Sequence, residues 1–140
     1  MSQVAAQLVL RRRAGRLAVI GIAAAATGLA WVLGKLAHVD YIADTPTGTR
    51  QITLALTTVA TLAAGLAGWI VIALLERYTS SPPRLWTALT IVVLVISIVP
   101  VFRTTANLGT QLMLTALHCV AAAVLIPALP TPHTTATRRR

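Results

Sequence analysis

Acidic residues are almost absent from this chain: Asp and Glu together occur three times among 140 residues, at Asp40, Asp44 and Glu76. Charged residues of both signs make up 11% of the sequence, whereas apolar residues make up 56%. A soluble globule of this size needs more polar surface than such a composition supplies. The composition therefore excludes an ordinary soluble domain.

Cysteine and aromatic residues are scarce as well. Cys119 is the single cysteine, so the chain cannot form an internal disulfide. Aromatic residues make up 4% of the chain, and they are not interleaved with the arginines as a nucleic-acid platform requires. The net charge of +9 therefore does not predict nucleic-acid binding. HExxH, GxSxG and phosphate-loop motifs are missing too.

What the chain does have is four long apolar stretches, at residues 14–37, 51–75, 85–101 and 108–129. About 20 apolar residues in a helix cross the ~30 Å hydrocarbon core of a bilayer. We therefore predict an all-α fold, an integral membrane four-helix bundle over residues 14–130. A basic N-terminal segment, 1–13, precedes it and a disordered basic tail, 131–140, follows. A signal-peptide cleavage site needs a small residue three positions before the cut, and Lys35 occupies that position before Ala37. The first span is therefore expected to be an uncleaved anchor.

The basic residues are distributed unevenly around these spans. If the four spans alternate, nine cations fall on one side: Arg11, Arg12, Arg13, Arg16, Arg77, Arg84, Arg138, Arg139 and Arg140. Lys35, Arg50 and Arg103 fall on the other. By the positive-inside rule, both termini are predicted to be cytoplasmic, in a multi-pass protein of the cell membrane. The basic clusters are expected to contact the bilayer through its anionic headgroups.

Small residues suggest how the first two spans pack. Such residues let helix backbones approach closely in lipid. We expect one stripe on each span to meet the other: Gly21, Ala25 and Gly28 against Thr61, Ala64 and Gly68. Thr57 and Thr61 are expected to bond back to carbonyls of their own helix.

Polar residues and prolines predict where the spans begin and end. Thr47 or Thr49 is expected to cap the second span and Asn107 the fourth. Pro82 and Pro83 should start the third span, with Trp86 as an anchor at the inner interface. Pro100 should kink or end that span, with Ser97 helping to satisfy the freed backbone groups.

His118 and Asp40 are the candidate catalytic residues. His118 lies within the fourth span, where ionisable groups are costly and usually face the interior. One interpretation is that His118 is a proton carrier, a general base or a ligand-binding group. The alternative is a neutral ring that is hydrogen-bonded to a neighbouring helix. Asp40 follows the first span and is able to orient His118, to pair with Arg103 or Arg50, or to remain a solvated loop acid. No metal or cofactor site is expected, because neighbouring helix residues such as His118 and Cys119 point about 100° apart. Glu76 is expected to pair with a local arginine.

Several short features occur in a recognisable order. They are Val39-Asp40 after the first span, Leu74-Leu75-Glu76-Arg77 closing the second, Trp86, Ser97 and Pro100 in the third, and Leu117-His118 and Ile126-Pro127 in the fourth. In this order the chain resembles an uncharacterised family of small actinobacterial four-span membrane proteins, a domain of unknown function. The resemblance covers residues 14–130. It implies a fold and a taxon but no activity.

Three kinds of function remain open. The first is a non-catalytic structural or regulatory membrane component that self-associates as a homo-oligomer or binds a partner. The second is a membrane-embedded acid/base enzyme, an isomerase or cyclase, that acts on a lipophilic small molecule with His118 and Asp40. A proton-coupled exporter is the weakest, because no acidic residue lies in mid-membrane. A polar, outward-facing cavity lined by His118 would favour the enzyme, whereas a packed interior would favour the non-catalytic component.

Overall fold

Four helices form the body of the molecule, as the computed structural model of the chain shows for residues 2–45, 48–103 and 106–130. They are α1 (Ser2–Leu36), α2 (Leu54–Tyr78), α3 (Pro82–Arg103) and α4 (Leu108–Ala128). All four are long and apolar enough to cross a membrane, in agreement with the four long apolar helices predicted from the sequence. The predicted tail, 131–140, lies outside the described residues.

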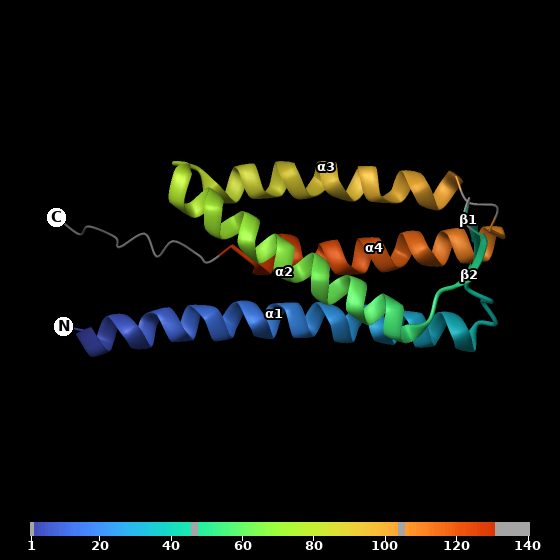
Figure 1. Cartoon of the computed structure of the whole chain (residues 1–140), viewed down its shortest axis with the longest axis horizontal. Coiled ribbons are helices and arrows are strands. Elements are labelled where there is room, and N and C mark those ends of the chain that lie inside the picture. Colours follow the sequence, from blue (N-terminus) through green and yellow to red (C-terminus); the bar gives the residue numbers. More distant parts are fainter. Residues whose placement is uncertain (1, 46–47, 104–105, 131–140) are drawn as a thin grey trace.

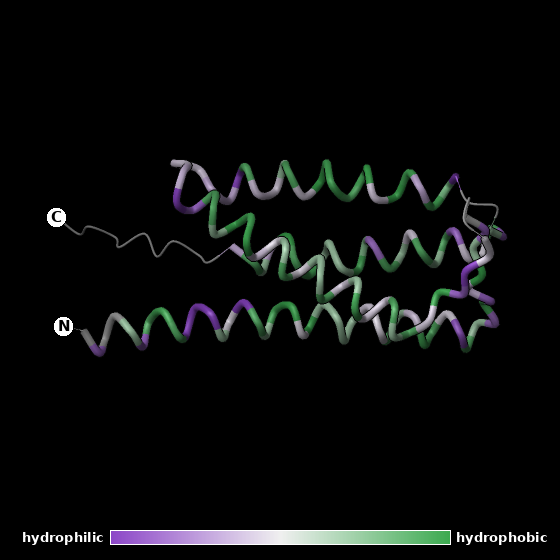
Figure 2. The backbone as a smooth tube through the Cα atoms, viewed as in Figure 1, coloured by the Kyte–Doolittle hydropathy of each residue, from purple (hydrophilic) through white to green (hydrophobic). Residues whose placement is uncertain are grey.

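Successive helices run in opposite directions, so that the bundle has two distinct ends (Figure 1). One end, here called the basic end, contains the start of α1 and the connection between α2 and α3. The other, the hairpin end, contains the strands β1 (Ile42–Thr45) and β2 (Gly48–Gln51). α1 extends past the other helices at the basic end, and hydrophilic residues gather there and at the hairpin end (Figure 2).

The two strands are an addition to the predicted all-α fold. They pair antiparallel, from Ile42 opposite Gln51 to Thr45 opposite Gly48. Gly48 has a φ of 122°, which favours glycine. The sequence predicted a turn here but not the strands, because each has four residues and no clear alternation of apolar and polar side chains.

The helix caps agree with the sequence in one case and differ in the other. Asn107 accepts a hydrogen bond from Thr110 N at 2.8 Å and caps α4, as predicted. α2 is capped by Thr53, whose hydroxyl accepts from Leu56 N at 3.2 Å. The predicted Thr49 cap is wrong, because Thr49 lies in β2 and pairs with Asp44; the alternative, Thr47, lies outside the described residues.

Tyr41 fastens the hairpin end to α1. Its buried ring stacks on Trp31 with centroids 5.3 Å apart, and its hydroxyl donates to the Trp31 carbonyl at 3.1 Å. The Trp31 indole N–H donates to Ile52 O at 3.1 Å. The Lys35 ammonium lies 5.6 Å from the centre of the Tyr41 ring. These contacts hold the connection between α1 and α2 over the end of the bundle.

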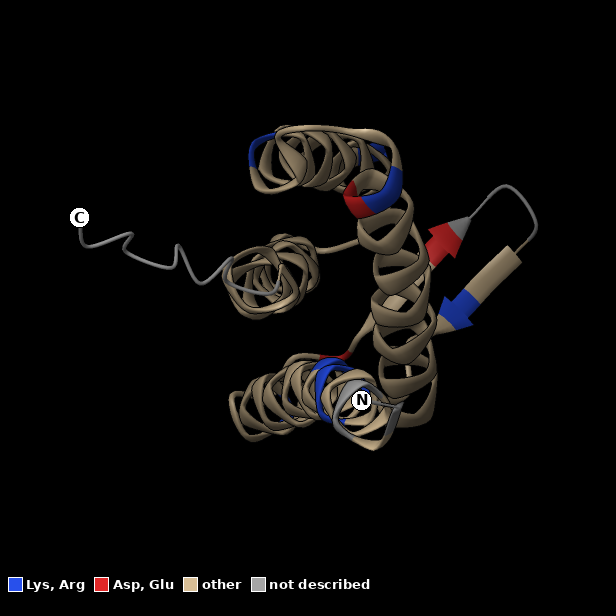
Figure 3. Ribbon diagram, turned by 90° about the vertical axis from the view of Figure 1, so that its left-hand side faces the viewer, with Lys and Arg blue, Asp and Glu red and all other residues tan. Residues whose placement is uncertain are grey.

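α2 crosses the bundle obliquely. Its first turns lie beside α1 and its last turns beside α3, as two perpendicular views agree (Figures 1 and 3). α1 packs against α2 and α4, and α3 packs against α4 and α2. α2 and α3 therefore separate towards the hairpin end. In the view of Figure 1, α4 lies behind the space between them.

The main core cluster consists of Ile20, Ile72, Trp86 and Leu129, one from each of α1, α2 and α3 and one just after α4. Gly65 of α2 allows the close crossing with α1, since a Cβ there would lie 2.8 Å from Ile20 Cγ2. This core brings all four helices together at one level.

The predicted contact between the small-residue stripes is wrong in part. Gly28 does face α2, because a Cβ on it would lie 3.5 Å from Leu54 Cδ1. Gly21 and Ala25, however, are exposed. The contact is made by a stripe turned by one residue, about 100° around the helix. It includes Ile20, which lies against Gly65, and Thr27, which lies against Thr61.

The stripe on α2 also differs from the prediction. Thr61 is buried and faces α1, where its hydroxyl lies 3.1 Å from that of Thr27. Gly68 instead faces Trp86, since a Cβ on it would lie 2.9 Å from the indole. Ala64 is exposed.

Trp86 is a core residue and not the interfacial anchor that was predicted. Its side chain is buried, and its indole N–H donates to Ile126 O of α4 at 3.1 Å. In a regular helix this carbonyl would accept from residue 130, but Pro130 has no N–H to give. Trp86 thus supplies the donor that a proline removes.

Pro100 does not end α3, which continues to Arg103. The Ser97 hydroxyl donates to Leu94 O at 2.8 Å. It does not donate to Ile96 O, the carbonyl that Pro100 leaves without its usual helical donor. The predicted role of Ser97 is therefore wrong.

Candidate functional site

A cavity of about 290 Å³ lies between the first half of α2 and the middle of α4. It occupies the opening that the oblique course of α2 leaves on the hairpin side of the core. Ala60 and Ala64 line it and are exposed, so the cavity is open at the side of the bundle. Its lining residues are Ile52, Leu56, Thr57, Ala60, Thr61, Ala64, Leu114, Leu117, His118 and Ala121.

One face of each helix supplies most of this lining. On α2, Thr57, Thr61 and Ala64 recur every three or four residues. On α4, Leu114, His118 and Ala121 do the same. Residues at such spacings lie on the same side of an α-helix. Apart from two threonines and one histidine, the walls are apolar, as lipophilic ligands require.

His118 is partly buried in the wall of this cavity, about 15 Å along α4 from its start. Its Nδ1 lies 2.7 Å from Leu114 O, one turn earlier on the same helix. A carbonyl only accepts, so Nδ1 carries the hydrogen and donates. In the neutral ring Nε2 is then the free hydrogen-bond acceptor.

The threonine hydroxyls are also committed as donors. Thr57 donates to Thr53 O at 3.1 Å, and Thr61 donates to Thr57 O at 2.9 Å. These bonds confirm the predicted back-bonding. Each hydroxyl has one hydrogen and two lone pairs, so its remaining capacity is to accept. The Thr61 hydroxyl, however, already lies 3.1 Å from the Thr27 hydroxyl of α1. The groups that offer acceptors to a ligand are therefore Nε2 of His118 and the Thr57 hydroxyl.

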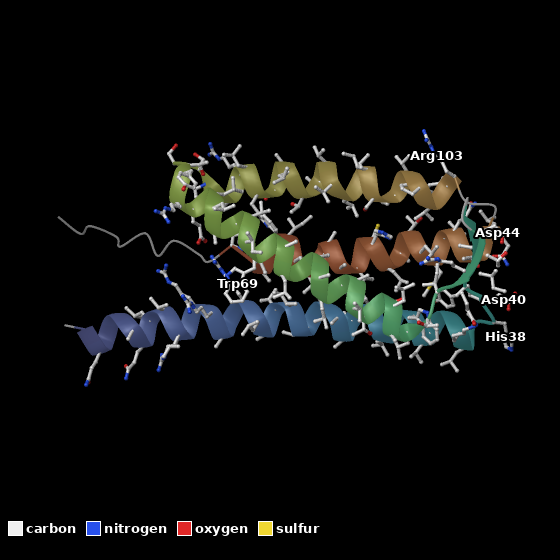
Figure 4. All side chains as sticks on the ribbon, viewed as in Figure 1. His38, Asp40, Asp44, Trp69 and Arg103 are labelled. Atoms are coloured by element: carbon white, nitrogen blue, oxygen red, sulfur yellow. The ribbon has the colours of Figure 1, made fainter. Side chains whose placement is uncertain are left out.

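Asp40, the second candidate, is exposed and follows α1 at the hairpin end (Figure 4). It is not one of the residues that line the cavity of His118. Its backbone oxygen accepts a hydrogen bond from Lys35 Nζ at 3.4 Å. A site shared by His118 and Asp40 stays a prediction.

Glu76 lies at the basic end, far from His118 along the bundle. It forms an ion pair with Arg16 of α1, with 2.5 Å between Oε1 and Nη2. The sequence predicted an arginine partner but a local one, and this partner lies 60 residues away in the chain.

Cys119 is exposed beside His118 and does not line the cavity. Within the described parts of the chain, no three His, Cys, Asp or Glu residues are grouped so as to hold a metal ion.

Sequence reasoning identified His118 but not the wall that faces it. Thr57 and Thr61 were interpreted as part of a packing face. The available signal was the matching stripe on the fourth span, where Leu114, His118 and Ala121 recur at helical spacing.

Residues 8–135 match the family described as "Family of unknown function (DUF6069)". No curated protein and no solved structure matches the chain.

Proposed function

The chain belongs to the family of unknown function DUF6069, and from this premise we propose that it is a multi-pass membrane protein that binds a lipophilic alcohol between α2 and α4. The observation that carries the proposal is the lateral cavity lined by His118, Thr57 and Thr61. Apolar walls favour a hydrocarbon body. The acceptors that His118 and Thr57 offer favour a ligand with a hydroxyl group, which donates one hydrogen bond.

Binding without catalysis fits these residues better than an isomerase or cyclase. Acid/base chemistry needs two groups within hydrogen-bond reach of the substrate, directly or through one water. His118 lines the cavity and Asp40 does not. Self-association as a homo-oligomer stays a prediction of the sequence.

We propose further that the basic end faces the cytoplasm and that the protein resides in the cell membrane. Arg11, Arg12, Arg13 and Arg16 on α1 join Arg77 and Arg84 at this end, whereas Lys35, Arg50 and Arg103 belong to the hairpin end. This difference supports the orientation through the positive-inside rule. The cavity then opens towards the outer half of the bilayer.

Melting of the purified protein in detergent, with decanol or decyl methyl ether added, tests the binding proposal. The two compounds have the same chain, but the ether cannot donate a hydrogen bond. Decanol is expected to raise the melting temperature and to bind about three- to tenfold more tightly than the ether, the range of one net hydrogen bond. His118→Phe should remove this preference.

Two matched variants test the place of binding. Ala64→Leu fills the cavity and should abolish stabilisation by both compounds. Ala63→Leu adds the same side chain at an exposed position that does not line the cavity. Equal behaviour of the two leucine variants, or equal binding of alcohol and ether to the wild type, would refute the proposal.

A further inference from the structure

A second cavity, of about 360 Å³, lies at the basic end between α1 and the residues that follow α4. Arg11, Arg12 and Arg16 line it on one side. Leu8 and Val19 of α1 and Leu129 give it apolar walls. It is separate from the cavity of His118 and shares no residue with it.

Arg16 is the unusual member of this lining. The residue is 8% exposed, and its Nη2 donates to Glu76 Oε1. Its Nε is buried and, within the described part of the chain, has no hydrogen-bond partner. A buried donor without an acceptor is costly, and most such groups in proteins are paired. An oxygen acceptor placed in the cavity would supply the missing partner.

Arg12 and Arg16 are four residues apart and so lie on the same side of α1. Arg11 also lines the cavity. For Arg11 and Arg12, both exposed, the structure records no ion pair among the residues it describes. Guanidinium groups bind phosphate oxygens with paired hydrogen bonds. The charge and the missing acceptor therefore both point to a phosphate group.

The surroundings favour a phosphate that carries hydrocarbon chains. On α1 the lining of the cavity runs from Leu8 through the three arginines to Val19. Along α1 a hydrophilic segment near the basic end gives way to apolar turns (Figure 2). Val19 and Leu129 continue its wall towards the core. Basic pockets between membrane helices on the cytoplasmic side bind anionic lipid headgroups in this way.

We propose that this cavity is a binding site for the headgroup of an anionic phospholipid, with its phosphodiester bound by Arg11, Arg12 and Nε of Arg16. The acyl chains then extend past Val19 and Leu129. The site goes beyond the proposed binding of a lipophilic alcohol and does not depend on it, because the two cavities share no lining residue. The first lies between α2 and α4, and the second between α1 and the end of α4 with the two residues after it.

The test uses the full chain in detergent, titrated with dioctanoyl phosphatidylglycerol, dioctanoyl phosphatidylcholine or inorganic phosphate. The melting temperature gives an apparent Kd for each. Phosphatidylglycerol is expected to stabilise the protein more than phosphatidylcholine, because the arginines repel the choline cation beside the phosphodiester of the latter. Inorganic phosphate, which has no acyl chains to occupy the apolar wall, is expected to leave the melting temperature unchanged. Each arginine near a membrane surface contributes on the order of a fivefold change in Kd. Arg11→Gln with Arg12→Gln should therefore weaken binding about 25-fold.

Arg13→Gln is the matched control, because Arg13 is exposed beside Arg12 and does not line the cavity. It should leave the Kd within about twofold, well below the effect expected for one lining arginine. Arg16→Lys keeps a charge for Glu76 but removes Nε, and should weaken binding about three- to tenfold, the range of one net hydrogen bond. If Arg16→Lys does not fold, the double variant Arg11→Gln with Arg12→Gln still tests the proposal.

Three results would overturn the proposal. Equal stabilisation by phosphatidylcholine would show that the headgroup charge is not recognised. Equal stabilisation by inorganic phosphate would make this a site for free anions. If Arg13→Gln lowered the affinity for phosphatidylglycerol as much as the double variant of Arg11 and Arg12, binding would depend on net charge and not on this cavity.

Discussion

Arg16 on α1 donates a hydrogen bond to Glu76 on α2, and their atoms Nη2 and Oε1 are 2.5 Å apart. The Arg16 side chain is 10% exposed and that of Glu76 25%. Removal of one partner of a buried ion pair leaves the other charge uncompensated. The pair therefore joins the basic ends of two helices that the sequence separates by 60 residues.

Glu76→Gln is expected to lower the free energy of unfolding by about 1–2 kcal/mol. Loss of a buried partner costs ~3–5 kcal/mol, but the partial exposure of Glu76 and the retained amide acceptor reduce this. Denaturation with SDS in mixed micelles measures it. Asp40→Asn, which neutralises an exposed carboxylate, should change stability by less than about 0.5 kcal/mol. Equal stability of the two variants would contradict a structural role for the pair.

Gly65→Ala is expected to destabilise the crossing of α1 and α2 by about 1–3 kcal/mol through overpacking. The added methyl would lie 2.8 Å from Ile20 Cγ2, and Ile20 is itself buried. The same change at Gly21 meets no atom within 4 Å. Gly21→Ala should therefore be neutral, or stabilising by up to about 1 kcal/mol through helix propensity. Thermal melts of the two variants compare their stabilities. If Gly21→Ala were the more destabilised of the two, α1 would contact α2 through the face of Gly21, as the sequence predicted.

Trp86→Phe is expected to cost about 1–3 kcal/mol, because it leaves Ile126 O without the donor that Pro130 cannot supply. Replacement of Pro130 by Ala in the same chain restores an N–H for that carbonyl. The double variant should therefore be destabilised less than the sum of the two single changes. The wild type, the two single variants and the double variant form a double-mutant cycle. If the two effects were additive in this cycle, Trp86 would contribute to stability by packing alone.

Alkaline pH is expected to destabilise the hairpin end. Burial raises the pKa of Tyr41 above its ordinary value of about 10. The folded state then holds this proton more tightly than the unfolded state, so stability is full below about pH 10 and falls as pH rises above it. Tyr41→Phe should flatten a series of melting temperatures across this range, whereas Tyr78→Phe, which removes an exposed phenol, should leave the decline in place. If the melting temperature of Tyr41→Phe still fell with rising pH as in the wild type, another titrating group would cause the fall.

The orientation is tested by cysteine labelling in intact cells, in a Cys119→Ser background. Asp44→Cys on the hairpin should react with an impermeant maleimide, and Ser80→Cys between α2 and α3 should react only after the cells are opened. The reverse pattern would place the basic end outside and would contradict the positive-inside reasoning.

The helices were predictable because bilayer thickness fixes how many apolar residues a span needs. Stops and starts such as Asn107 and Pro82 are local signals and were also predictable. Which neighbour a helix face meets was not, since Gly21 and Ile20 sit on equally apolar sequence and only packing in three dimensions selects Ile20. The same holds for Trp86, because an indole suits the membrane interface and a buried core alike.

The candidate site shows a similar division. His118 was recognisable as a costly polar residue in an apolar span. That Thr57 and Thr61 share its cavity depends on the oblique course of α2, and no residue pattern encodes a crossing angle. An arginine partner for Glu76 was predicted, but its identity as Arg16 was not, because contacts over 60 residues leave no periodic trace in a single sequence.

The sparse burial of α3 has a consequence for how this chain can diverge over evolutionary time. Its buried residues are Pro82, Trp86 and Val101, near its two ends, and none of the described residues 87–100 is buried. Hydrocarbon chains have no fixed shape, so valine, isoleucine and leucine are nearly interchangeable in this central stretch. Neutral substitutions should therefore accumulate faster there than on α1, as long as the average hydropathy is kept.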